Sequence, residues 1–147
     1  MYYFKLMRKV IFLTIFFCFL NMFLQPSYAI TEQLLVHLSD IIALLSAALV
    51  TAIVSLNTSD ILDEEVVYYI NNDKKNLLVK TIIICILCVF SPTLLNTLDG
   101  YWFQYLILSL VTACFILVGT NFWALYKLKE SIDNELRLSK FNLDKQK

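Results

Sequence analysis

The side chains that could carry chemistry in this sequence are few and widely separated. His37 and Asp40 are three residues apart, so they share a face if the segment is helical. Ionisable groups within a membrane helix are costly and often functional, which points to a proton relay or a ring of Asp40 carboxylates at a pore mouth. Both residues lie near the end of an apolar segment, so a hydrated helix end is the alternative interpretation.

The cysteines lie in apolar surroundings. Of the four, Cys18, Cys85, Cys88 and Cys114, two have the Cys-x-x-Cys spacing of redox and metal sites, but isoleucine and leucine surround them. We expect these thiols to pack as apolar groups, with no disulfide, metal site or cofactor. With one histidine, two glycines and no carboxylate cluster in the apolar segments, the sequence does not indicate an enzyme.

The composition is that of a membrane protein. Apolar residues make up 59% of the 147 residues and charged residues 16%, against about 45–50% and about 25% in soluble domains. Four segments lack Asp, Glu, Lys and Arg, and a helix of about 20 apolar residues crosses a bilayer. We therefore predict an all-α, polytopic membrane helix bundle. The expected helices cover residues 10–25, 38–57, 78–97 and 102–126.

The first apolar segment has two interpretations. A basic leader precedes the apolar block 10–24, and the small residues Ser27 and Ala29 follow at the positions that a signal peptidase reads. Residues 1–29 are thus either a cleaved signal peptide, which would leave three helices, or an uncleaved first transmembrane helix. The bundle itself would occupy residues 30–126.

The charged residues predict an orientation. Lys and Arg number twelve, as do Asp and Glu, so the net charge is zero, which argues against binding to nucleic acid. All twelve basic residues fall on one side of the predicted spans, and cytoplasmic flanks carry this excess. They are Lys5, Arg8, Lys9, Lys74, Lys75, Lys80, Lys127, Lys129, Arg137, Lys140, Lys145 and Lys147. We expect a bacterial inner membrane and a cytoplasmic C-terminus.

Trp102 and Trp123, about 31 Å apart on a helix, are expected to anchor the fourth helix at the two interfaces.

The second helix carries a strip of small residues. They recur every four positions and would let another helix approach closely in lipid. The strip consists of Ser39, Ala43, Ala47, Thr51 and Ser55. We expect this face to meet protein, either within the chain or in a second copy, and the bulky face to meet lipid or a looser neighbour. The bulky face consists of Ile41, Ile42, Leu45, Leu49, Ile53 and Leu56.

Three further elements are predicted around the spans. Residues 60–70 form a short amphipathic helix under the membrane, capped by Ser59 or Asp60 and ending at Asn71-Asn72. This helix either simply leads the chain back into the membrane, or it docks a partner or gates the protein. Residues 127–147 form a charged helical tail, either a solvated extension or part of a bundle between protomers. Pro92 kinks the third helix, for packing or as a hinge.

The layout resembles that of the phage-exclusion membrane proteins of the RexB type. The points of likeness are the small residues from Ser39 to Ser55 and the ending Leu125-Tyr126-Lys127-Leu128, within residues 30–130. The resemblance implies four membrane helices and a depolarising pore used in defence, a picture from which a cleaved leader would depart.

Three classes of function stay open. The first is a small protein that assembles with other copies, as a pore or membrane effector. The second is an accessory or scaffolding subunit of a secretion, conjugation or toxin-immunity complex, and the third is a phage holin. The expected partners are the lipid bilayer and either further copies of the protein, as a homo-oligomer, or other membrane proteins.

Overall fold

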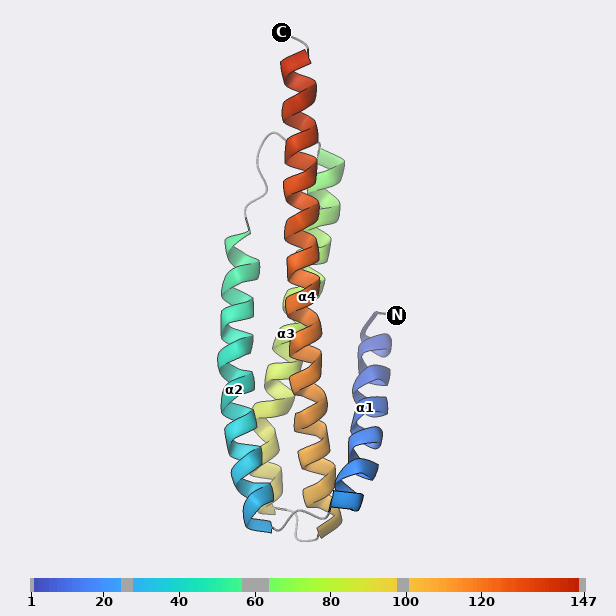
Figure 1. Ribbon diagram of the computed structural model, residues 1–147, viewed down its shortest axis with the longest axis vertical. Helices are drawn as coiled ribbons and strands as arrows, with labels where there is room; N and C mark the ends of the chain where they lie inside the picture. The colour runs from blue at the N-terminus through green and yellow to red at the C-terminus, as the bar shows by residue number, and fades with distance from the viewer. Residues whose placement is uncertain (1, 25–27, 57–63, 98–100, 146–147) are drawn as a thin grey trace.

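Four α-helices form the structure, a computed structural model that describes residues 2–24, 28–56, 64–97 and 101–145. They are α1 (Tyr2–Leu24), α2 (Tyr28–Ser55), α3 (Glu64–Thr97) and α4 (Tyr101–Lys145), drawn in Figure 1. Each of the four is long and apolar enough to cross a membrane. The predicted all-α bundle with four hydrophobic helices is therefore confirmed.

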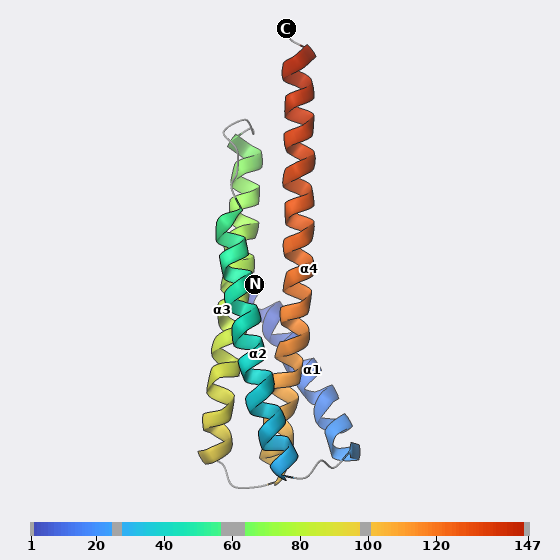
Figure 2. The same ribbon diagram turned by 60° about the vertical axis from the view of Figure 1, so that its left-hand side comes forward.

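The helices run alternately up and down, and α4 is the central element. It packs against α1, α2 and α3, while α2 and α3 also pack against each other. Figures 1 and 2 show α1 at the edge, beside the first half of α4, with α3 and α4 rising beyond the other helices. With 45 residues, α4 is about 67 Å long, so it extends well past a hydrocarbon core of about 30 Å.

The core follows a seven-residue repeat. On α2 the side chains of Leu35, Ile42 and Leu49 are fully buried, and on α3 those of Leu77 and Ile84 are nearly or fully so. This spacing keeps one seam of each helix facing its neighbour, as in a left-handed coiled coil. The seam meets a stripe on α4 that is also buried, made of Ile107, Val111, Cys114 and Val118.

The basic residues gather at one end of the bundle. The N-terminal part of α1, the first half of α3 and the second half of α4 carry them, and these three parts lie toward the same end (Figure 1). We call this the basic end. There the Lys74 ammonium of α3 donates a hydrogen bond to the Leu56 carbonyl, which satisfies a backbone acceptor at the C-terminus of α2.

The segment predicted as a separate amphipathic helix is part of α3. The helix passes through Asn71 and Asn72 without a break, so the end predicted there is wrong. Its apolar stripe packs on the extension of α4 in a small second core, where Ile70 and Ile132 are 5% and 4% exposed. The proposed caps Ser59 and Asp60 lie outside the described residues.

Candidate functional site

The two faces of α2 differ in part from what we expected. The bulky side chains Ile42, Leu49 and Ile53 are buried in the bundle, whereas Ala47, Thr51 and Ser55 are exposed. A lipid-facing environment is therefore wrong for Ile42, Leu49 and Ile53, whereas Ile41 of the same face is exposed. Most of the small-residue strip is not used within the chain.

The geometry of the helix explains why the strip leaves the core. Each step of four residues turns about 400°, so the strip drifts about 40° per step around the helix. Ser39 is buried, Ala43 is half-buried, and from Ala47 onward the strip is exposed. The seven-residue seam drifts far less over the same length, so it stays in the core.

A groove runs along the exposed strip between α2 and α3. It has a volume of about 390 Å³, and its α2 wall includes Ala43, Ala47 and Thr51. Its α3 wall includes Ile82 and Ile86, both exposed. Small residues on one wall and branched apolar residues on the other form a surface that suits close helix packing.

One polar atom in this groove has no partner. Ser46 lines the groove, its side chain is 2% exposed, and its hydroxyl oxygen makes no hydrogen bond among the described residues. Leaving such a buried hydroxyl unsatisfied costs about 1–3 kcal/mol. The groove therefore contains an unused hydrogen-bonding group beside the small residues.

The structure brings Ser39 and Pro92 together through one backbone carbonyl. Proline has no N–H, so Pro92 cannot donate to the carbonyl of Cys88 four residues earlier. The Ser39 hydroxyl of α2 donates to this Cys88 oxygen across 3.1 Å, and the bond is buried. Helix α3 continues through Pro92 to Thr97. The hydrogen bond from Ser39 of α2 therefore stabilises α3 at the position where the backbone bond from residue 92 to Cys88 is missing.

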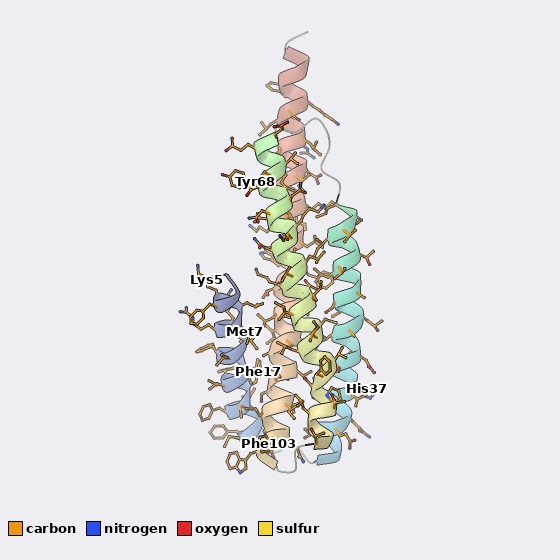
Figure 3. The ribbon with its side chains drawn as sticks, turned by 180° about the vertical axis from the view of Figure 1, so that it is seen from behind. Lys5, Met7, Phe17, His37, Tyr68 and Phe103 are labelled. Atoms are coloured by element: carbon orange, nitrogen blue, oxygen red, sulfur yellow. The ribbon has the colours of Figure 1, made fainter. Side chains whose placement is uncertain are left out.

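The two ionisable candidates lie on the outer surface of α2. His37 and Asp40 are both exposed, and Figure 3 shows His37 toward the end of the bundle where Phe103 also lies. That end is opposite the basic end. Asp40 falls on the same side of α2 as Thr51 and Ser55, within about 60° around the helix axis.

Two asparagine amides, one buried and one half-buried, form further interhelical bonds that the sequence analysis did not single out. The Asn121 amide of α4 donates to the Thr81 hydroxyl of α3 at 3.3 Å, and the Asn21 amide of α1 donates to the Ser109 hydroxyl of α4 at 3.0 Å. The available signal was an asparagine in an otherwise apolar segment, since such residues hydrogen-bond across membrane helices.

The remaining candidates have simpler environments. Trp102 and Trp123 are exposed near opposite ends of the apolar part of α4, and Trp123 stacks on Tyr126 and lies under the Lys127 ammonium. The four cysteines are free, and Cys88 and Cys114 are buried. Within the described ranges no three His, Cys, Asp or Glu side chains come together as a metal site.

These observations describe a small membrane protein whose most distinctive surface is the exposed side of α2. No family model, curated protein or solved structure matches the chain.

Proposed function

We propose that this protein acts by assembling with further copies of itself through the groove between α2 and α3. The observation that carries the proposal is the exposure of Ala47 and Thr51 beside the groove, while Ile42, Leu49 and Ile53 supply the contacts of α2 within the chain. In lipid, exposed apolar surface alone does not drive association, because lipid tails solvate it as well as protein does. Small residues and unused polar groups do favour association, because they allow close backbone contact and interhelical hydrogen bonds.

The Ser46 hydroxyl supports the same interpretation. It is buried in the single chain, it has no partner there, and it lines the groove next to Ala43 and Ala47. A helix from a second copy that packs closely against the small residues would bring backbone carbonyls and hydroxyls beside Ser46, and rotation of the Ser46 side chain toward the groove would let its hydroxyl bond them. Assembly would then satisfy a group that the isolated chain leaves without a hydrogen bond.

A matched pair of variants tests the assembly face. Ala47→Leu places a bulky side chain in the groove, whereas Ala48→Leu makes the same change at an exposed neighbour that does not line it. Overpacking of about 1–3 kcal/mol predicts that Ala47→Leu weakens association about 5- to 160-fold. The measurement is energy transfer between copies labelled at the end of α4, in vesicles diluted with lipid. A monomeric parent, or equal weakening in the two variants, would refute the proposal.

We further propose that the assembly is a conduit, with Asp40 and Ser55 facing its interior. These polar side chains are exposed and share one side of α2, and polar groups in membrane helices are expensive unless water or protein contacts them. The likeness to RexB-type proteins implies a depolarising pore used in defence. In this proposal the excess of Lys and Arg at the basic end puts that end in the cytoplasm of a bacterial inner membrane.

The same pair of variants separates the conduit from the other classes of function. Expression with a membrane-potential dye should show depolarisation for the parent and for Ala48→Leu, and none for Ala47→Leu. Assembly without depolarisation at any expression level would favour a scaffolding subunit instead. Abrupt lysis only with a co-expressed endolysin would favour a holin.

A further inference from the structure

A second groove, unrelated to the α2 face, lies between α1 and α4 at the basic end. It has a volume of about 510 Å³, within the size range of ligand sites. Phe12 and Leu13 of α1 and Ile116 and Leu117 of α4 form its apolar walls. Arg8, Lys9 and Thr120 complete its lining, so the groove combines an apolar channel with two cations and a hydroxyl, and no carboxylate lines it.

The two helices hold these groups in a defined register. They are antiparallel, and the hydrogen bond from Asn21 to Ser109 ties their far ends together. Val10 of α1 and Leu117 of α4 are both buried nearby, at 4% exposure each. The groove walls are therefore set by packed helices rather than by a loop.

The cations lie close to the aromatic side chains expected at the membrane interface. Thr120 is one helical turn before Trp123, which stacks on Tyr126 with the Lys127 ammonium over its ring. Such aromatic side chains favour the interface between hydrocarbon and water. Arg8 and Lys9 are exposed, and the structure gives neither of them an acidic partner among the described residues. The apolar walls, by contrast, continue toward the middle of the bundle.

We propose that this groove binds one anionic phospholipid, with its phosphate against Arg8 and Lys9 and an acyl chain between α1 and α4. Basic pockets between membrane helices bind anionic headgroups because charge attraction adds to burial of the chain. A zwitterionic lipid offers the same acyl chain but no net charge, so the site should discriminate by headgroup. The site requires that α1 stays in the mature protein, and it does not depend on assembly through α2.

The test is native mass spectrometry of the full-length chain, released from detergent with equal amounts of phosphatidylglycerol and phosphatidylcholine. The intact mass of 17.1 kDa shows in the same spectrum that α1 is present. The parent should retain one phosphatidylglycerol in preference to phosphatidylcholine. The Arg8→Gln/Lys9→Gln double variant should lose about thirtyfold of that preference, about five- to sixfold for each cation.

Two further variants separate a site from general attraction to a basic surface. Lys5→Gln/Lys75→Gln removes the same charge from exposed positions outside the groove and should leave the preference within about twofold of the parent. Thr120→Phe fills the groove without changing its charge and should also reduce retention. No headgroup preference in the parent, equal losses in the two double variants, or a mature chain that lacks α1 would each overturn the proposal.

Discussion

The bond between Ser39 and Cys88 gives the sharpest test of how the bundle is held together. Ser39→Ala removes the side-chain hydrogen bond to the Cys88 carbonyl, which Pro92 cannot replace because it has no N–H. A buried carbonyl left unsatisfied costs about 1–3 kcal/mol, and measured interhelical bonds in membranes reach about 1.7 kcal/mol. We therefore expect Ser39→Ala to lower the free energy of unfolding by about 1–2 kcal/mol.

A second substitution identifies the cause of this loss. Pro92→Ala restores an N–H four residues after Cys88, so the carbonyl regains a bond within α3 and no longer depends on Ser39. In the Pro92→Ala background, Ser39→Ala should cost about 0.5 kcal/mol or less. The coupling between the two sites should thus be about 1 kcal/mol, which a double-mutant cycle resolves.

The assay is reversible unfolding in mixed micelles of mild detergent and dodecyl sulfate, followed by circular dichroism and tryptophan fluorescence. Ser91→Ala is the matched control, because the Ser91 hydroxyl is buried one residue before Pro92 but bonds the Leu87 carbonyl of its own helix at 2.7 Å. It should change stability by no more than about 0.5 kcal/mol. An equal cost of Ser39→Ala with and without Pro92 would show that the proline does not create the need for the bond.

The remaining predictions concern two buried positions outside this turn. Ser46→Ala should raise the free energy of unfolding of the isolated chain by about 1 kcal/mol, because the Ser46 hydroxyl is buried without a partner there. The same substitution should weaken association between copies. Equal or lower stability of the variant in micelles would contradict this. Ile132→Asp should abolish amide-exchange protection at the start of α3 and the end of α4, because an unpaired charge cannot stay in that second core. The exposed neighbour change Ser131→Asp should leave protection intact, and equal effects of both substitutions would argue against a packed second core.

The number of helices was predictable because charge is expensive in lipid. Four segments free of Asp, Glu, Lys and Arg correspond to the four helices. Their ends were less predictable, since the cost of a polar residue disappears outside the hydrocarbon. Helix α3 (Glu64–Thr97) passes through Asn71. Asparagine in a helix costs up to about 0.7 kcal/mol relative to alanine, and packing of this part of α3 on α4 outweighs that cost.

The environment of α2 could not be decided from its sequence. Every residue from Ile41 to Leu56 is uncharged, so hydropathy does not distinguish a face toward lipid from a face toward protein. Two periodicities compete on this helix, one of four residues through Ala47 and one of seven through Leu49. Only the seven-residue seam finds complementary seams on α3 and α4, and this depends on residues far away in the chain.

The interhelical bonds indicate where specificity in this bundle resides. In lipid, apolar contacts distinguish poorly between one neighbour and another, whereas a hydrogen bond requires a particular donor opposite a particular acceptor. The pairs Asn21–Ser109, Asn121–Thr81 and Ser39–Cys88 connect α1 to α4, α3 to α4 and α2 to α3. Among buried side-chain nitrogen and oxygen atoms in the described residues, only the Ser46 hydroxyl lacks a partner. Because the described polar interior is otherwise satisfied, the assembly that we propose through the groove beside Ser46 would offer this hydroxyl a partner as well as adding contact area.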